Sequence, residues 1–266
     1  YYLTLSPYGF FWLELRPARD GAAGTAEGPR ALTTPPASLL ARPGRELTEV
    51  VAAYVRQRRW FGGRDRAVVR RKVLDVVELG DATSVVVLQL DYADGEPDVY
   101  SVPLAEVTGA HAEDLLAHRA EVVLGSFGDE RHRRLLVDAL GDAGAAARLV
   151  RALSGRRRAR GAHGGLTIDV PARVRATVRD AAARGEVRVL GAEQSNSSVV
   201  IGNQVILKGI RRVHDGVNPD LEIGRHLTDV GFEHIAPVLG SSSWEHGRSS
   251  ATLGVLHAFV PNEGDA

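Results

Sequence analysis

Hydrophobic and polar positions alternate with two different periods in the first half of this chain. Residues 46–59 place apolar side chains every three or four positions, which predicts an amphipathic helix that ends at a Trp-Phe-Gly-Gly run. Residues 68–79, 83–92 and 98–104 are rich in β-branched residues and are separated by short turns, which predicts three strands. One helix over an antiparallel sheet is the economical assembly of these elements.

The second half of the chain contains a longer series of predicted elements. An apolar face made by Leu135, Leu136, Ala139 and Leu140 predicts a helix over 130–153. The elements expected after it are a basic, glycine-rich loop at 154–165, a strand at 187–190, a polar turn at 191–198, two extended segments within 198–208 around Gly202-Asn203, a helix at 219–230, and strands at 237–241 and 250–260. The order from 187 onward is that of a kinase small lobe.

The N-terminal region has a different composition. Residues 1–15 combine aromatic and β-branched residues on either side of Ser6-Pro7, which predicts two short strands around a turn. Residues 16–40 contain mainly Ala, Gly, Thr and Pro, and have too few large apolar side chains to offset chain entropy. We therefore expect a linker there.

Composition narrows the classes of function. The 266 residues are 44% hydrophobic, with 33 basic and 33 acidic side chains, so the net charge favours neither nucleic acid nor an anionic membrane. The absence of cysteine excludes disulfides and thiolate chemistry. We find no membrane-spanning run and no signal peptide, and expect a cytoplasmic protein. The chain contains no methionine and opens on Tyr1, so we expect it to be a fragment.

The strongest chemical candidate is the pair Lys208 and Glu222. Only Lys72 and Lys208 are lysines among the 33 basic residues, and Lys208 closes an apolar strand. A compact ammonium at a strand end can meet nucleotide phosphates, and a carboxylate on the next helix can orient it. We predict a Lys208–Glu222 ion pair. The competing interpretation is a solvated strand end beside an exposed helix residue.

The polar turn offers a second candidate. Ser195, Asn196, Ser197 and Ser198 could arch over a nucleotide, because backbone N–H groups and small hydroxyls bind phosphate oxygens. The alternative is a simple hairpin. The glycine, lysine and Ser/Thr pattern of a Walker P-loop is absent.

Two segments resemble a known family. Residues 193–212, followed by 216–225, resemble the small-lobe signature of bacterial maltokinases, which are aminoglycoside-phosphotransferase-like kinases. Residues 57–64 (QRRWFGGR) are similar to the hallmark of the cap domain of that family, although Arg64 replaces a lysine commonly found there. Residues 1–15 resemble the final strands of trehalose synthase, which some bacteria fuse to maltokinase.

The resemblance implies an α+β protein with a cystatin-like cap domain and a protein-kinase-like N-terminal lobe. The implied boundaries are a trehalose synthase-like tail at 1–17, a linker at 18–41, the cap domain at 42–145, a connecting segment at 146–185 and the kinase-like lobe at 186–266. The implied reaction converts maltose and ATP into maltose 1-phosphate and ADP, for α-glucan synthesis from trehalose.

The resemblance also assigns roles to residues. Lys208 would contact the nucleotide phosphates, Glu222 would pair with it, Ser195 to Ser198 would form the loop above them, and 257–262 would approach the adenine. The catalytic base, the Mg²⁺ ligands and most contacts to maltose belong to a C-terminal lobe in this family. We therefore expect no catalytic and no metal-binding residue in the fragment, and no kinase activity of its own.

Other functions are weaker interpretations. One alternative interpretation is that the cap is a non-catalytic docking module of a trehalose synthase fusion, with Trp60 and Phe61 as contact residues if they are exposed. Arg156, Arg157, Arg158 and Arg160 lack the interleaved aromatic residues of a nucleic-acid site. The histidines show no zinc-ligand spacing, and no GxSxG or facing carboxylate pair supports a hydrolase.

Overall fold

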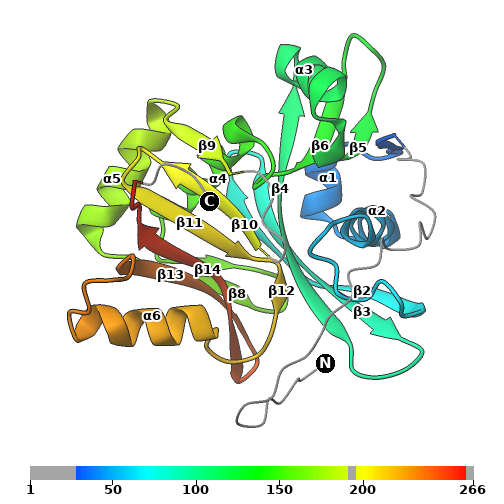
Figure 1. Cartoon of the computed structure of the whole chain (residues 1–266). Helices are drawn as coiled ribbons and strands as arrows, with labels where there is room; N and C mark the ends of the chain where they lie inside the picture. Colours follow the sequence, from blue (N-terminus) through cyan, green and yellow to red (C-terminus); the bar gives the residue numbers. More distant parts are fainter. Residues whose placement is uncertain (1–27, 191–195, 262–266) are drawn as a thin grey trace, which may run out of the picture.

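The computed structural model describes residues 28–190 and 196–261, which form two β-sheets with helices between and around them (Figure 1). Within these residues each sheet has seven strands. The first sheet has the order β1-β5-β6-β4-β3-β2, with β12 paired to β4. Its strands are β1 (Arg30–Ala31), β2 (Val68–Gly80), β3 (Thr83–Tyr92), β4 (Asp98–Thr108), β5 (Val123–Phe127), β6 (Arg134–Asp138) and β12 (Arg212–Val213).

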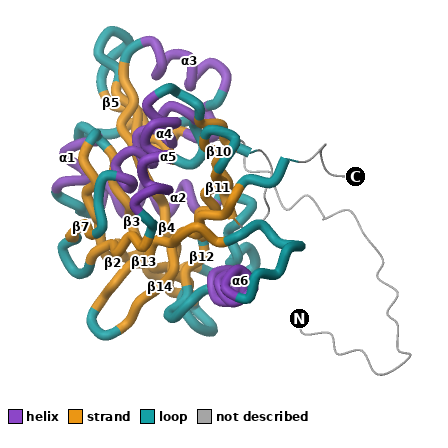
Figure 2. Tube along the Cα trace, turned by 90° about the vertical axis from the view of Figure 1, so that its left-hand side faces the viewer, coloured by secondary structure: helices purple, strands orange, loops and turns teal. Residues whose placement is uncertain are grey.

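The second sheet has the order β7-β8-β13-β14-β11-β10-β9, and all its neighbouring strands are antiparallel. Its strands are β7 (Arg158–Arg160), β8 (Gly165–Asp169), β9 (Val187–Val189), β10 (Asn196–Ile201), β11 (Val205–Ile210), β13 (Val238–His246) and β14 (Ser249–Ala258). The helices are α1 (Pro36–Ala41), α2 (Arg45–Arg56), α3 (Ala110–His118), α4 (Ala143–Ser154), α5 (Ala172–Ala183) and α6 (Pro219–Asp229), with a 3₁₀ turn at Ala120–Val122. Helix α5 packs on α4, whereas α6 lies away from both and contacts β13 and β14 (Figure 2).

The first sheet is buried on both faces, which explains why β3 is apolar along most of its length. Successive side chains of a strand point to opposite faces. Val86 and Leu88 belong to the hydrophobic cluster that includes the apolar stripe of α2, whereas Val85 and Val87 belong to the cluster that includes α4. The continuous apolar run therefore serves two cores.

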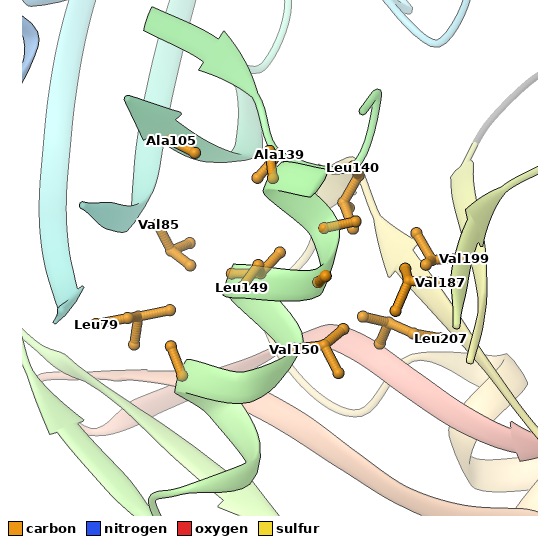
Figure 3. Close-up of a cluster of buried hydrophobic side chains, with 14 of the residues drawn as sticks. Leu79, Val85, Ala105, Ala139, Leu140, Leu149, Val150, Val187, Val199 and Leu207 are labelled. Carbon is orange, nitrogen blue, oxygen red and sulfur yellow. The ribbon is translucent and has the colours of Figure 1, made fainter. Parts of the chain in front are cut away.

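Helix α4 lies between the two sheets and joins their cores (Figure 3). Its N-terminus is capped by Asp142, whose carboxylate accepts a hydrogen bond from the Ala145 N–H at 2.8 Å. In Figure 3, Leu149 lies toward Val85 of the first sheet and Val150 toward Leu207 of the second. Since alanine takes up little space, the alanines of this helix allow both sheets to approach it closely.

One extended segment belongs to both sheets. Strand β11 lies between β10 and β14 in the second sheet, and after Arg211 the chain continues directly into β12. Strand β12 pairs with β4 of the first sheet, with Arg212 opposite Tyr100 and Val213 opposite Val99. The N–H of Ser101 also donates to the Arg211 carbonyl at 2.9 Å. Movement of β11 is therefore coupled mechanically to the first sheet.

The predicted α+β class is confirmed, with a helix over an antiparallel sheet followed by a second sheet. Helix α2, strands β2 to β4, the hairpin of β10 and β11, helix α6 and strands β13 and β14 occupy the predicted regions. The expected order of strand, strand, helix and two strands at the end of the chain is also present.

The predicted helix at 130–153 is wrong in its first half. Residues Arg134–Asp138 form strand β6, and α4 begins only at Ala143. The apolar residues at 135–137 are completely buried in the first sheet. A short apolar run fits a buried strand as well as a helix, so periodicity could not distinguish the two. The basic loop expected at 154–165 also contains strand β7.

The linker expected at 18–41 needs correction over its described residues. Residues 28–41 include β1, which pairs with β5 in parallel, and helix α1. Leu32, Leu39 and Leu40 are each at most 7% exposed and pack in the cluster around α2. Three leucines are enough to hold this segment in place, because they pack into a hydrophobic core that α2 and the first sheet already form. Residues 1–17, predicted to form trehalose synthase-like strands, lie outside the described residues.

Residues 146–185, expected to be a connecting segment, contain most of α4, strands β7 and β8, and helix α5. Strand β8 pairs with β13, so this segment extends the second sheet. Within the described ranges, no helix combines the length and apolar character needed to cross a membrane.

Candidate functional site

The hairpin of β10 and β11 positions Lys208. Its turn has Gly202 and Asn203 at its centre with φ of 58° and 50°, and the N–H of Gln204 donates to the Ile201 carbonyl at 3.2 Å. Positive φ at both central residues gives a twist that matches the flanking strands, and Gly and Asn tolerate it best. Lys208 is opposite Ser198 on β10 and opposite Val255 on β14.

The Lys208 ammonium meets the first turn of α6. Its Nζ lies 2.5 Å from Oδ2 of Asp220, and the two side chains are 30% and 46% exposed. Asn218 caps this helix by accepting a hydrogen bond from the Asp220 N–H at 2.9 Å, and Pro219 follows the cap. An ion pair this exposed contributes at most about 1 kcal/mol to stability. Lys208 can therefore leave Asp220 at little cost.

The predicted partner of Lys208 is wrong. Glu222 is exposed, and in the described part of the chain it takes part in no ion pair. Glu222 lies two positions after Asp220, which is about 200° around an α-helix. The two carboxylates therefore point in nearly opposite directions, and only Asp220 can face β11.

The predicted phosphate loop lies only partly within the described residues. Ser195 lies outside them, and Asn196, Ser197 and Ser198 form the first residues of β10 rather than a free turn. Ser198 is 1% exposed, and the Ser197 hydroxyl accepts a hydrogen bond from Nε of Arg211 at 2.8 Å. Ser197 is therefore held by the guanidinium that follows β11.

Arg211 forms a buried ion pair with the first sheet. Its Nη2 donates to both carboxylate oxygens of Asp138, at 2.9 and 2.7 Å, and both side chains are 2% exposed. The same carboxylate accepts hydrogen bonds from the Tyr54 hydroxyl at 2.9 Å and the Leu140 N–H at 3.0 Å. Asp138 is thus fully hydrogen-bonded, which buried charges require.

Aromatic rings complete the surroundings of Arg211. Its guanidinium carbon lies 5.1 Å from the Trp60 ring, and its Nη1 is buried without a hydrogen-bond partner among the described residues. A cation over an indole ring gains attraction that partly replaces a hydrogen bond. Burial, together with the charge of Asp138, raises the pKa of Tyr54 well above its ordinary value. Tyr54 therefore remains a neutral donor.

Arg212 binds a second buried carboxylate. Its Nη2 lies 2.5 Å from Oδ1 of Asp98, which is 3% exposed. Asp98 also accepts hydrogen bonds from the hydroxyls of Tyr92 at 2.7 Å and Tyr100 at 3.1 Å. Burial is the main reason that the pKa of both tyrosines is raised. Two consecutive arginines thus enter two separate carboxylate sites of the first sheet.

The Trp-Phe-Gly-Gly run is part of this junction. A Cβ atom at Gly63 would overlap the Tyr92 hydroxyl, and one at Gly62 would lie 3.2 Å from Nη1 of Arg212. Phe61 is buried at 5% exposure, and Trp60 is partly buried between the rings of Tyr54 and Tyr100. The aromatic pair therefore packs within the chain, and the glycines leave room for Tyr92 and Arg212.

Sequence reasoning missed the role of this arginine pair. Both Arg211-Arg212 and the Trp-Phe-Gly-Gly run belong to the segments that resemble maltokinases, but nothing in their spacing joins them. Of the residues expected near the adenine, His257 has Nδ1 at 3.2 Å from the Ala236 carbonyl, and Asn262 lies outside the described residues.

Comparison of the chain with known protein families supports the predicted resemblance for the part of the chain that forms most of the first sheet. Residues 54–142, about a third of the chain, match the family model of the maltokinase N-terminal cap domain. Among solved structures, the chain is similar to a glucosamine kinase (crystal form B) with 18% identity, 81% coverage of this chain and a TM-score of 0.47. A glucosamine kinase in complex with glucosamine, ADP and inorganic phosphate gives 18% identity, 81% coverage and a TM-score of 0.44.

The chain spans 41% of the length of these glucosamine kinases. The segment that matches the cap family includes Asp138 and Asp98, which bind Arg211 and Arg212, and Tyr54, which donates a hydrogen bond to Asp138. The resemblance to a maltokinase cap is thus confirmed for this part of the chain.

Proposed function

We propose that this chain forms the cap and the nucleotide-binding part of an ATP-dependent sugar kinase of the maltokinase type. In the full reaction the anomeric hydroxyl of maltose gives its proton to the catalytic base and attacks the terminal phosphorus of ATP. The bond from that phosphorus to the bridging oxygen breaks, and maltose 1-phosphate and ADP result. The observation that carries the proposal is the weakly paired Lys208 on a strand that is fixed to a maltokinase-like cap.

Lys208 would bind the phosphates of the nucleotide. Phosphoryl transfer depends mainly on positioning and on stabilising negative charge, and an ammonium supplies both. Asp220 would orient Lys208 before the nucleotide binds, taking the role that was predicted for Glu222. Ser197, held by Arg211, would keep the start of β10 close to Lys208. Ser195 and Asn196 remain predicted members of the phosphate loop, whereas the side chain of Ser198 is buried within β10.

The proposed reaction also needs Mg²⁺. Within the described ranges, no group of three or more histidine, aspartate or glutamate side chains could hold a metal ion. Protein-bound Mg²⁺ commonly uses one or two carboxylates together with substrate phosphates. In this proposal the ion therefore arrives with ATP, and its carboxylate ligands and the catalytic base lie outside the described residues. A trehalose synthase domain is the proposed neighbour of residues 1–17.

Maltose-dependent ADP release by the full-length gene product tests this proposal. We expect Lys208→Ala to lower kcat/KM by about 100-fold or more, in the range found when one transition-state donor is removed. Asp220→Asn should lower it by a smaller factor, because the ammonium remains. Glu222→Gln is the matched control on the same helix and should leave kcat/KM within about threefold, because Glu222 points away from Lys208.

Two results would contradict the proposal. Equal activity of the wild-type protein and the Lys208→Ala variant would remove Lys208 from the site. Absence of ADP release with maltose and related sugars would favour a non-catalytic docking module instead.

A further inference from the structure

A groove lies where the two sheets meet, and its lining includes residues of β2 and β12 from the first sheet and of β13 from the second. It has a volume of about 710 Å³, which is within the range of small-molecule sites. Its lining includes the apolar side chains of Leu74, Val99, Val213 and Trp244, which are partly or fully buried and are termed its floor. Its lining does not include Lys208, so it is distinct from the candidate nucleotide site.

The walls of this groove carry hydrogen-bond donors and one permanent cation. Lys72 of β2 contributes an exposed ammonium, and His163, His214 and His246 contribute imidazole rings from three separate segments. Lys72 is one of only two lysines in the chain. Both lysines therefore lie at candidate ligand sites, whereas the structural ion pairs at the junction use arginine.

His246 is held in place before any ligand binds. Its ring stacks on Trp244 with 3.9 Å between centroids and 18° between planes, and its Nε2 lies 3.0 Å from Oδ1 of Asp215. Trp244 is itself 4% exposed. Asp215, the only acidic residue in the lining, is thus occupied by His246.

A buried carboxylate holds the loop that carries His163. Asp75 is 2% exposed and accepts hydrogen bonds from the N–H groups of Ala162 at 2.8 Å and His163 at 3.1 Å. It also accepts a hydrogen bond from Nε1 of Trp244 at 3.0 Å. One carboxylate therefore positions both the floor of the groove and one of its imidazoles.

The glycines of this loop are required by the same carboxylate. A Cβ atom at Gly161 would overlap the carboxylate oxygens of Asp75. One at Gly164 would overlap the Glu245 carbonyl and lie 2.8 Å from Nε1 of Trp244. The loop therefore packs directly against β2 and β13, which holds the backbone of His163 beside the groove.

We infer that this groove binds a phosphate group, carried on a small sugar or as the free ion. An ammonium and the imidazole N–H groups of His163 and His214 are donors that phosphate oxygens accept, and the acidic residue in the lining is already engaged by His246. The volume exceeds that of one phosphate, and the apolar floor suits the C–H faces of a sugar ring. Metal binding is disfavoured, since no metal-ligand cluster occurs among the residues described.

The inference does not depend on the proposed kinase activity, and direct binding tests it. We would titrate the 266-residue chain by calorimetry with glucose 6-phosphate, inorganic phosphate and glucose. We expect saturable binding of at least one phosphate-containing probe and none of glucose. Preference for glucose 6-phosphate identifies a sugar phosphate as the ligand, and equal or tighter binding of inorganic phosphate identifies the free ion.

Two exposed cations, Lys72 in the groove and Arg179 outside it, supply the matched variants. Lys72→Ala should weaken the binding of the preferred probe by at least tenfold, whereas Arg179→Ala, which removes a cation that is 58% exposed and does not line the groove, should leave it within twofold. Both side chains are partly or fully exposed, so both variants should fold, which circular dichroism would verify. His246→Ala should also weaken binding, because it leaves the Asp215 carboxylate unpaired and free to repel a phosphate. The inference is wrong if no phosphate-containing probe binds, or if Lys72→Ala weakens binding no more than Arg179→Ala does.

Discussion

Lys208 and Arg211 lie three residues apart on one extended segment, and their surroundings are opposite. The Lys208 side chain is 30% exposed and has one carboxylate partner, Asp220, which is itself 46% exposed. The Arg211 side chain is 2% exposed and shares two hydrogen bonds with Asp138, which is equally buried. The same segment therefore carries one cation that can exchange its partner and one that cannot.

This difference in burial assigns the two cations different roles: Lys208 is available to bind a ligand, and Arg211 anchors the strand to the first sheet. A buried charge that loses its partner is strongly destabilising, so Arg211 stays with Asp138 in every folded molecule. An exposed pair contributes little, so Lys208 can exchange Asp220 for a nucleotide phosphate. The cap supplies Asp138 and Asp98, and it thereby fixes the strand on which Lys208 is presented. In this account the cap supports the site without contacting the nucleotide.

The largest expected effect comes from Asp138. Asp138→Asn keeps the shape of the side chain but leaves the Arg211 charge unpaired, which should lower the free energy of unfolding by about 3–5 kcal/mol. Urea denaturation measures this. Asp114→Asn is the control, because Asp114 is 66% exposed in its ion pair with His118, and it should change stability by about 0.5 kcal/mol or less. An equal loss of unfolding free energy in Asp138→Asn and Asp114→Asn would show that burial does not make the Arg211–Asp138 pair more important for stability than the exposed His118–Asp114 pair.

A pH effect should follow from the tyrosines of the two carboxylate sites. Tyr54, Tyr92 and Tyr100 have raised pKa values in the folded protein, mainly because of burial. Below the ordinary pKa of about 10 both states are protonated, so stability is unaffected. Above it the unfolded state loses protons that the folded state keeps, and stability should fall by about 1.4 kcal/mol per pH unit for each tyrosine until its folded pKa is reached.

Denaturation between pH 9 and 11 would measure this fall. Tyr92→Phe removes one of the three ionisations and should reduce the slope above pH 10 by about a third of the tyrosine contribution. A slope that is the same in this variant would contradict the assignment of the alkaline effect to these buried hydroxyls.

Much of the fold could be predicted from the sequence because its elements have strong local patterns. Helix α2 has a clear apolar stripe, and the turn at Gly202-Asn203 fixes the hairpin by backbone conformation alone. Both depend on residues that are neighbours in the chain. Strand β6 and helix α1 were missed because their apolar residues are few, and they are buried only by packing against segments that are distant in the sequence.

The site was predicted less completely for a related reason. Lys208 could be recognised by its rarity and its position, but its partner depends on the rotation of α6 about its axis, which spacing alone does not determine. Arg211 and Asp138 are 73 residues apart, and no local pattern links them. The carboxylate sites of the cap therefore became visible only when the two sheets were seen together.

The most direct test of this account compares stability and activity in the Lys208→Ala variant of the full-length gene product. We predict a fall in maltose-dependent ADP release of about 100-fold or more, together with a change of at most about 1 kcal/mol in the free energy of unfolding. A loss of several kcal/mol with little loss of activity would contradict it, because Lys208 would then be a structural cation like Arg211.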